Sequence, residues 1–207
     1  MDILNPRLVA GLTLTLYLIG LGAAFGLRAW VQYRRTGDTG LRRLPKDAPG
    51  AGRLGAALFA CSLLLVTVGL VLAVIAPGGR LWPTGPATWV GVALAVAGLA
   101  AVLASQAAMG PSWRVGVDPS EKTGLVTSGP FAVTRNPIFS AMGLTLIGIA
   151  IMVPSPIILG ALAAFVAGVQ LQVRAVEEPY LSRVHGGSYR EYAARVGRFV
   201  PLLGRWR

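Results

Sequence analysis

Two short motifs rich in charged and amide side chains stand at the two ends of one long apolar stretch. Arg135-Asn136-Pro137 precedes the stretch Ile138–Val176, and Glu177-Glu178-Pro179 follows it. A carboxylate that faces the inside of a helical bundle at a membrane surface needs a cation, either an arginine of the protein or a positively charged group of a ligand. An arginine and the backbone N–H groups of a helix N-terminus can bind an anionic group. If the two motifs meet in space, they mark the place where a charged ligand would bind.

The length of the apolar stretch decides whether the two motifs can meet. Its 39 residues would measure roughly 58 Å as a helix, close to two crossings of a hydrocarbon core of about 30 Å. Val153-Pro154-Ser155-Pro156 lies near its middle, where prolines end a helix and favour a turn. The sequence therefore predicts a hairpin of two spanning helices that returns Glu177 to the membrane face that Arg135 left.

Three further windows are nearly free of charge and long enough to cross a membrane, namely Leu8–Ala29, Leu54–Ala76 and Ala87–Met109. The chain is 54% hydrophobic and only 13% charged, and its mean hydropathy is +0.64. These values lie outside the range of ordinary soluble domains. We expect an all-α polytopic membrane protein with five transmembrane helices. Residues 31–53 are expected to form a loop that lies on the lipid headgroups.

The basic residues predict the orientation. Of the 19 Lys and Arg residues, 17 lie in the segments 28–53, 110–137 and 174–207, and only Arg7 and Arg80 lie on the other side. The positive-inside rule then places the N-terminus outside and the C-terminus in the cytoplasm, and the Ala/Gly/Arg-rich composition is typical of a bacterial inner-membrane protein. Because the cations flank membrane spans and no nucleic-acid motif accompanies them, we expect membrane lipids and not nucleic acid as the partner.

Each motif also has a purely structural interpretation. Asn136 could cap the helix that begins at Pro137, with Arg135 anchoring to lipid phosphate. The two glutamates could lie in water, paired with Arg174 or Arg183. The single cysteine, Cys61, and the single histidine, His185, make a metal site improbable. After residue 177 an apolar stripe interrupted by Gly186-Gly187 predicts a short helix, a turn and a second amphipathic helix.

Six stretches, taken in order, resemble the isoprenylcysteine carboxyl methyltransferase family, in its broad sense of small integral-membrane methyltransferases. They are Gly110-Pro111-Ser112-Trp113-Arg114, Leu125 to Phe131, Arg135-Asn136-Pro137-Ile138-Phe139, Glu177-Glu178-Pro179-Tyr180-Leu181, His185-Gly186 with Tyr189, Tyr192 and Val196, and Phe199-Val200-Pro201. The resemblance covers residues 105–201. It divides the chain into membrane helices 1–3 with a basic loop, residues 1–104, and a methyltransferase-like core, residues 105–207.

The resemblance implies S-adenosylmethionine as cofactor, bound near the cytoplasmic face beneath a lid formed by the C-terminal segment. It also implies a lipophilic or lipid-linked substrate that enters between helices. The cofactor-binding residues that it implies are Arg135, Asn136, Pro137, Phe139, Glu177, Glu178, Tyr189 and Tyr192. Glu177 or Glu178 would face the ammonium group of the cofactor, and Arg135 or the Asn136 region would face its carboxylate. Arg135 and Glu177 are the residues that we expect to be catalytic.

Two positions depart from the family pattern. Asn136 replaces a more usual histidine, and Phe139 stands where tyrosine is common, so a hydroxyl is missing there. We see no general base, which favours an acceptor that is already ionised, a carboxylate or a thiolate, over an amine or an alcohol. Two other classes remain open. One is an NADPH-dependent membrane reductase of the steroid 5α-reductase type, and the other is a small transporter or scaffold without enzymatic activity.

Overall fold

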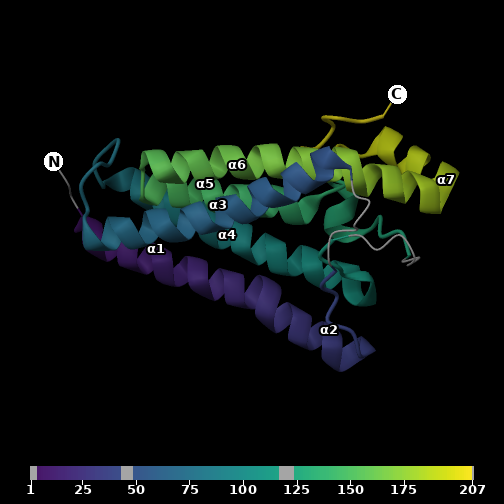
Figure 1. Ribbon diagram of the computed structural model, residues 1–207, viewed down its shortest axis with the longest axis horizontal. Coiled ribbons are helices and arrows are strands. Elements are labelled where there is room, and N and C mark those ends of the chain that lie inside the picture. The colour runs from purple at the N-terminus through teal and green to yellow at the C-terminus, as the bar shows by residue number, and fades with distance from the viewer. Residues whose placement is uncertain (1–3, 43–48, 117–123, 207) are drawn as a thin grey trace.

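The computed structural model of the protein describes residues 4–42, 49–116 and 124–206. These residues form a bundle of helices and contain no strand beyond two isolated β-bridges. The helices are α1 (Pro6–Leu21), η1 (Gly22–Leu27), α2 (Arg28–Thr36), α3 (Gly50–Ile75), α4 (Pro86–Met109), η2 (Gly110–Ser112), η3 (Gly129–Ala132), α5 (Pro137–Met152), α6 (Pro156–Gln172), η4 (Val173–Glu177) and α7 (Glu178–Arg195). The expectation of an all-α polytopic membrane protein is confirmed (Figure 1).

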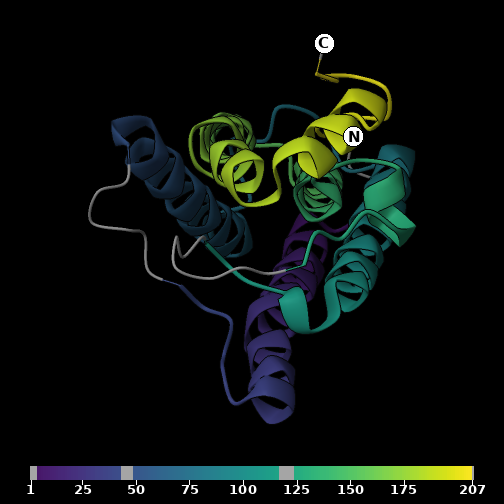
Figure 2. The same ribbon diagram turned by 90° about the vertical axis from the view of Figure 1, so that its right-hand side faces the viewer.

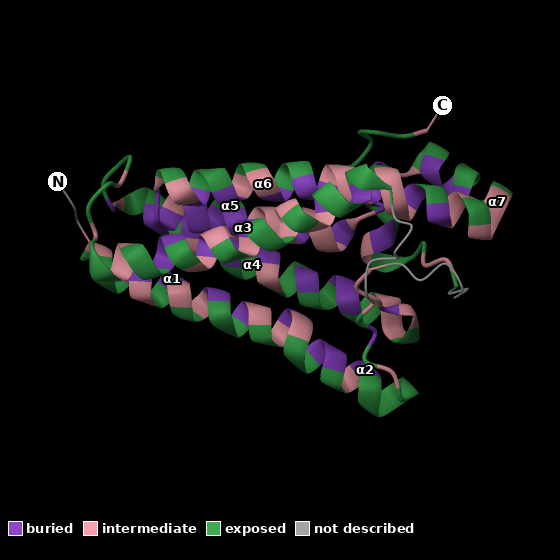
Figure 3. Ribbon diagram, in the orientation of Figure 1, coloured by how far each residue is buried: buried purple, intermediate pink, exposed green. Residues whose placement is uncertain are grey.

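Within the described ranges, four helical runs are long and apolar enough to cross a membrane. They are Pro6–Thr36, Gly50–Ile75, Pro86–Ser112 and Pro156–Arg195. The fifth predicted span is α5, which is apolar but has only 16 residues. At 1.5 Å per residue it is about 24 Å long, shorter than an average hydrocarbon core. Large apolar residues such as Leu8 and Ile75 are exposed, as surfaces that contact lipid require. Figure 3 shows exposed residues along the outer faces of the helices.

The predicted hairpin is present. Helix α5 ends at Met152 and α6 begins at Pro156, whose ring occupies the first helical position. The Ser155 hydroxyl accepts a hydrogen bond from the backbone N–H of Ile158 at 3.3 Å, so the second helix has its own N-terminal cap. The two helices run side by side and bring Glu177 back to the end of the bundle at which Arg135 begins the hairpin (Figure 1).

The first helix is longer than predicted. Residues 31–36, which the sequence placed in a loop, continue the helix as α2, and this part of the prediction is wrong. The helix ends at Gly37, whose φ of 76° is a left-handed conformation that favours glycine. Arg34 and Arg35 lie in the last turn, where cations interact favourably with the helix dipole. The basic residues that suggested a loop therefore stabilise the end of a helix.

Small residues bring the helices into backbone contact. An ideal Cβ on Gly168 of α6 would lie 2.8 Å from the backbone nitrogen of Phe59 in α3, and one on Gly148 of α5 would lie 2.5 Å from the nitrogen of Ala95 in α4. Close approach of this kind is the main source of helix association in lipid, where burying apolar surface gains little. The pairs α3–α6 and α4–α5 form the framework of the bundle. The division of the chain at residues 104 and 105 stays a prediction.

The N-terminus and the C-terminus lie at opposite ends of the bundle (Figure 1). The C-terminal end carries α2, the C-terminus of α4, the segments 110–116 and 124–136, and α7, and in the end-on view these elements surround the end of the bundle (Figure 2). Helix α7 has one kink, at Gly186, where φ is 54° and ψ is −121°. The predicted interruption at the glycine pair is therefore confirmed.

Candidate functional site

Arg135 and the double glutamate motif meet at the C-terminal end of the bundle. Nη2 of Arg135 donates to Oε1 of Glu178 at 2.6 Å, and both side chains are almost fully enclosed. Arg198 binds the same carboxylate with Nε at 2.8 Å and Nη2 at 2.9 Å. One carboxylate thus holds two guanidinium groups, one from the start of the hairpin and one from the segment after α7.

Arg135 also fixes the C-terminal segment directly. Its guanidinium donates to the carbonyl oxygens of Ala193, at 3.0 Å, and Gly204, at 3.1 Å, and also to that of Val196. Of its side-chain nitrogens only Nε has no partner among the described residues. Arg135 therefore acts first as a clamp that holds α7 and the residues after it against the start of α5. Most of its donors are used within the protein.

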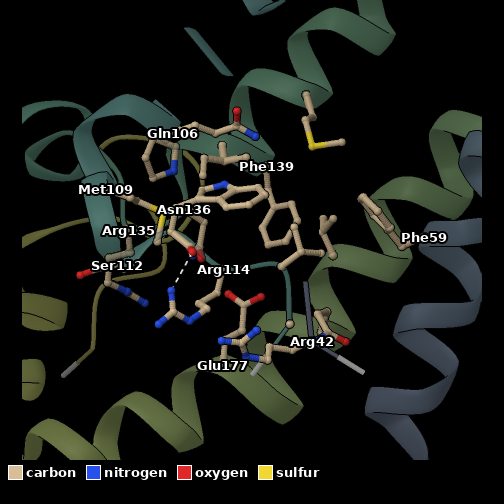
Figure 4. Close-up of a pocket in the computed structure, with 18 of the residues that line it drawn as sticks. Arg42, Phe59, Gln106, Met109, Ser112, Arg114, Arg135, Asn136, Phe139 and Glu177 are labelled. Atoms are coloured by element: carbon tan, nitrogen blue, oxygen red, sulfur yellow. Dashed lines mark hydrogen bonds between the residues drawn. The ribbon is translucent and has the colours of Figure 1, made fainter. Parts of the chain in front are cut away.

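A cavity of about 370 Å³ lies beside this clamp (Figure 4). Its volume falls in the range of small-molecule and cofactor sites. Of the predicted site residues, Arg135, Asn136, Pro137, Phe139 and Glu177 line it. The lining residues that reasoning from the sequence did not assign to the site include Arg42, Phe59, Gln106, Ser112, Trp113, Arg114 and Gln172. The motif at residues 110–114 pointed to Trp113 and Arg114, whereas nothing in the sequence singled out Arg42.

Glu177 and Glu178 have different environments although they are adjacent. Glu178 is 5% exposed and engaged by two arginines, while Glu177 lines the cavity. Within the part of the chain that the structure describes, the Glu177 carboxylate has neither a hydrogen bond nor an ion pair. Neither glutamate pairs with Arg174 or Arg183, the partners in the structural interpretation. Glu177 therefore offers the cavity a carboxylate whose charge the described side chains leave unmatched.

The N-terminus of α5 forms another part of the wall. Asn136 occupies the capping position, but its side chain makes no capping hydrogen bond, which corrects that expectation. Instead its Nδ2 donates to the carbonyl of Arg198 at 3.1 Å. Because the first N–H groups of a helix have no partner within it, those of Ile138 and Phe139 lack a helical acceptor, and both residues line the cavity. These N–H groups could bind an anionic group.

Phe139 contributes to the apolar part of the wall. Its ring packs edge-on against Phe59, with the ring centroids 6.1 Å apart. Phe59 comes from α3 and packs in turn against Phe165 of α6. The missing hydroxyl at position 139 is therefore replaced by an aromatic contact between helices, and the cavity is apolar on this side.

Three predicted cofactor-binding residues lie behind the cavity wall. Glu178 is in the clamp, and Tyr189 and Tyr192 are 1% and 4% exposed. The Tyr192 hydroxyl donates to the carbonyl of Phe131 at 2.6 Å, and the Tyr189 ring packs edge-on against Trp206 at 5.5 Å between centroids. None of the three is among the residues that line the cavity, so they position α7 and the C-terminal segment.

Arg42, which lines the cavity, is held in place by Asp38. Nη1 of Arg42 donates to Oδ1 of Asp38 at 2.9 Å, and the two groups also form an ion pair. The hydrogen bond from Arg42 is the main reason why the pKa of Asp38 lies well below its usual range, and a hydrogen bond from the backbone N–H of Gly40 lowers the pKa further. Arg114 also lines the cavity, and Figure 4 shows Arg42 and Glu177 at one end of the cavity and Gln106 at the other.

Both π-helical segments of the described chain adjoin the cavity. Ala24 and Phe25 of η1 and Glu177 of η4 line it. Such segments are rare and are often found at functional sites. Among the described residues, no group of three or more His, Cys, Asp or Glu side chains lies together in a way that could hold a metal ion.

Comparison with known proteins agrees with the sequence motifs. A model of the phospholipid methyltransferase family matches residues 86–188, from the start of α4 into α7. This family is one of the membrane methyltransferases that resemble isoprenylcysteine carboxyl methyltransferase, so the resemblance noted from the sequence is confirmed.

Two curated proteins are also similar over 143 residues, or 69% of this chain. The nickel-cobalt-cadmium resistance protein NccN of Alcaligenes xylosoxydans xylosoxydans is 29% identical, and the match covers 64% of its length. The cobalt-zinc-cadmium resistance protein CzcN of Cupriavidus metallidurans is 30% identical, and the match covers 63% of its length. The chain therefore spans just under two thirds of these relatives.

Proposed function

We propose that this protein transfers a methyl group from S-adenosylmethionine to a lipophilic acceptor. The first support is the match of residues 86–188 to the phospholipid methyltransferase family. The observation that carries the proposal is the Glu177 carboxylate, which lines a cavity of about 370 Å³ without a partner among the described residues. A ligand that brings an ammonium group to this carboxylate would remove the cost of an unmatched charge near the membrane.

The methionine part of the cofactor carries one ammonium and one carboxylate, and the cavity wall can accommodate both. Glu177 would bind the ammonium group. The N–H groups of Ile138 and Phe139 at the start of α5 would bind the carboxylate. Arg135 lies beside this region, but its donors hold the C-terminal segment, so we propose that it acts by positioning the wall.

The residues of the cavity suit methyl transfer to an ionised acceptor. When bound, S-adenosylmethionine supplies an electrophilic methyl group on a sulfonium centre. The protein has to hold the acceptor in line with that methyl group and exclude water, which positioning alone can accomplish. Phe59, Phe139 and Met142 provide an apolar wall for this purpose. If Glu177 binds the ammonium group, the described lining offers no second carboxylate as a base, which favours a carboxylate or thiolate acceptor.

We also propose that the reaction occurs at the cytoplasmic face of a bacterial inner membrane. The supporting observations are the 17 basic residues on the side of the C-terminal motifs and the lining of the cavity by Arg135 and Glu177, which lie at that end of the bundle. The acceptor would then reach the cavity from the inner leaflet. Lipids are the expected partners of the outer helix faces, which expose large apolar side chains.

Thermal unfolding of the purified protein in detergent, with and without S-adenosylhomocysteine, tests the proposal. We expect this compound to raise the midpoint temperature and NADPH to leave it unchanged. The variant Glu177→Gln should bind S-adenosylhomocysteine at least about tenfold more weakly, the value of one charge-assisted hydrogen bond. Glu191→Gln, an exposed glutamate on α7, is the matched control and should bind normally.

Two results would count against the assignment. Stabilisation by NADPH alone would favour the membrane reductase. Absence of any effect of either compound, in protein that unfolds cooperatively, would favour a transporter or scaffold. Equal affinity in Glu177→Gln and Glu191→Gln would remove Glu177 from the site.

A further inference from the structure

The residues that follow α7 form a tight loop with exposed apolar side chains. This C-terminal loop, residues 197–204, lies on the outer side of the molecule (Figure 1, Figure 2). Val200, Leu202 and Leu203 are 51%, 67% and 64% exposed, and Pro201 is exposed as well. Four consecutive apolar residues are therefore exposed in a segment that belongs to none of the candidate membrane-spanning helices.

The backbone of the C-terminal loop is fixed although its side chains are exposed. The N–H of Arg198 donates to the carbonyl of Leu203 at 2.8 Å, and the N–H of Leu203 donates to the carbonyl of Val200 at 3.1 Å. A Cβ at Gly197 would clash with the carbonyl of Val200, so the closed loop requires glycine there. Leu202 has a φ of 67°, a left-handed conformation that is uncommon for leucine. A strained leucine whose side chain is exposed gains little from the protein itself, which indicates a contact outside the chain.

Contacts with α5 set the depth of the C-terminal loop in the membrane. The N–H of Asn136 donates to the carbonyl of Arg198 at 3.1 Å, and the Ser140 hydroxyl donates to the carbonyl of Phe199 at 2.6 Å. Ser140 lies in the first turn of α5. Because α5 is about 24 Å long and a hydrocarbon core is about 30 Å thick, the ends of α5 lie at the edge of the hydrocarbon or within it. The loop beside its first turn therefore lies where headgroups meet acyl chains.

The backbone of the C-terminal loop is also suited to an apolar environment. Most of its carbonyl groups accept a hydrogen bond from the protein, which removes the main cost of placing irregular backbone against lipid. These carbonyls are those of Gly197, Arg198, Phe199, Val200, Leu203 and Gly204.

The charge around the C-terminal loop is complementary to an anionic lipid surface. Residues 192–207 include four arginines and neither Asp nor Glu. Arg198 binds Glu178, whereas Arg195 and Arg205 are exposed and have no acidic partner among the described residues. These two arginines stand on either side of the apolar residues in the chain. Exposed cations next to apolar side chains are typical of segments that lie in the interface of a membrane with anionic lipids.

We propose that residues 200–203 insert into the lipid leaflet at the C-terminal end of the bundle. Arg195 and Arg205 bind the phosphates of anionic lipids beside them. The inserted loop also supports the clamp, because it supplies the carbonyl of Gly204 to Arg135 and the guanidinium of Arg198 to Glu178. This lipid contact does not depend on which reaction the cavity catalyses.

A second copy of the chain fits this surface less well than lipid does. The exposed apolar side chains of one short loop cover far less than the roughly 800 Å² that each partner buries in a standard interface. The loop is continuous in depth with the lipid-facing start of the hairpin, and its unpaired arginines match the phosphates of a leaflet. Contact with a second copy is therefore an outcome that the experiment has to detect.

Measuring the depth of a spin label tests the insertion. The full chain carries Cys61→Ala and one label at Leu203→Cys, in nanodiscs of phosphatidylcholine and phosphatidylglycerol. Oxygen concentrates in the hydrocarbon, whereas a nickel chelate stays in water. We expect oxygen to relax the label at Leu203→Cys more strongly than the chelate does. A label at Leu64→Cys, which replaces a 62% exposed residue in the middle of α3, should show the same order.

Ala194→Cys is the matched control near the C-terminal end of α7, where the residue is also exposed. At this position the chelate should relax the label more strongly than oxygen. Val200→Cys provides a second position in the loop and should behave as Leu203→Cys does. If the chelate dominated at both loop positions, the loop would lie in water and the insertion would be refuted. Poor access of both reagents to the loop would mean that protein covers it, which would replace lipid by a second copy as the partner.

The arginines are tested by changing the lipid. The label at Leu203→Cys should lie deeper in discs that contain phosphatidylglycerol than in discs of phosphatidylcholine alone. Each arginine near an anionic surface shifts the equilibrium toward the inserted loop by about fivefold. Arg195→Gln combined with Arg205→Gln should therefore abolish the difference between the two lipids.

Arg34→Gln combined with Arg35→Gln is the control for the change in net charge. These arginines lie in the last turn of α2, and their loss should leave the lipid dependence intact. The same depth in both lipids with all arginines present, or equal effects of the two double variants, would contradict the headgroup contact of Arg195 and Arg205. Because the depths are compared in discs without cofactor, they do not depend on whether the protein binds S-adenosylmethionine.

Discussion

Removal of Glu178 should destabilise the protein far more than removal of its neighbour Glu177. Glu178 is the one carboxylate shared by Arg135 and Arg198, at 2.6 Å and 2.8 Å from the nearest nitrogens. The side chains of Arg135 and Glu178 are 2% and 6% exposed. Glu178→Ala leaves two guanidinium groups without their anion in an enclosed site. Breaking a buried pair from one side in this way costs about 3–5 kcal/mol of unfolding free energy.

Glu177→Ala provides the comparison. Because Glu177 has no ionic partner among the described residues, its loss should change the unfolding free energy by less than about 1 kcal/mol, the usual effect of a substitution that breaks no network. The two variants differ by one position in the chain and remove the same side chain. Both free energies can be measured by reversible unfolding in mixed micelles. A protein that binds only the unfolded state reports how much of the sample has unfolded.

A second measurement shows which part of the chain Glu178→Ala destabilises. In the intact clamp Arg135 holds the carbonyls of Ala193 and Gly204, so amide hydrogen exchange in residues 196–204 should be slow and should accelerate in Glu178→Ala. Arg198→Ala, combined with Glu178→Ala, should show a non-additive effect because the two residues share one network. Equal destabilisation by Glu177→Ala and Glu178→Ala, or unchanged exchange after residue 196, would refute the division of labour between the two glutamates.

Two further predictions follow from individual contacts. Gly168→Ala should destabilise the α3–α6 pair by about 1–3 kcal/mol, since a Cβ would lie 2.8 Å from a backbone nitrogen, whereas Gly160→Ala on the same helix, with nothing within 4 Å, should be neutral or stabilising in the same unfolding assay. Tyr192→Phe should cost about 1–2 kcal/mol, because the carbonyl of Phe131 loses its buried donor, and should leave the affinity for S-adenosylhomocysteine unchanged in calorimetry. A tenfold loss of affinity in Tyr192→Phe would instead place this hydroxyl on the cofactor.

The hairpin could be predicted from the sequence because lipid allows few alternatives. A stretch of this length whose single charge, Arg174, lies near its end, and which has prolines near its middle, has to cross the membrane and return. The charged residues at its ends then have to lie at the surface. The same reasoning placed Arg135 close to the double glutamate. The pattern of charges therefore predicted that the two motifs are neighbours, and in the structure Arg135 and Glu178 meet at 2.6 Å.

The roles of the two glutamates could not be predicted in the same way. Adjacent residues on a helix point about 100° apart, so the direction of each depends on the rotation of the helix before it. The π-helical segment η4 lies immediately before Glu178 and changes that rotation. No feature of the sequence Val173–Glu177 predicts a π-helical turn. The sequence thus identified the pair and left open which member faces the cavity.

The role of Arg135 also could not be predicted from the sequence. An arginine beside a cavity suggests a ligand contact, but the carbonyls of Ala193, Val196 and Gly204 use most of its donors. Those carbonyls come from the end of α7 and the irregular segment after it, whose path no periodicity in the sequence describes. The path depends on the clamp itself, so it becomes visible only when the tertiary structure is known.

The two π-helical segments adjoin the same cavity, and this points to the cavity as the reason for their irregular backbone. In η1, ideal Cβ atoms on Gly22 and Gly26 would meet nothing within 4 Å, so these glycines do not permit a close helix contact of the kind made by Gly148 and Gly168. The segment instead places Ala24 and Phe25 in the wall of the cavity, and the carbonyl of Ala24 accepts a hydrogen bond from the side chain of Gln106. The segment η4 likewise places Glu177 in the wall of the cavity. An irregular hydrogen-bond pattern within lipid is costly. Its presence twice, each time beside the same cavity, indicates that the shape of this cavity has determined the backbone of α1 and α6.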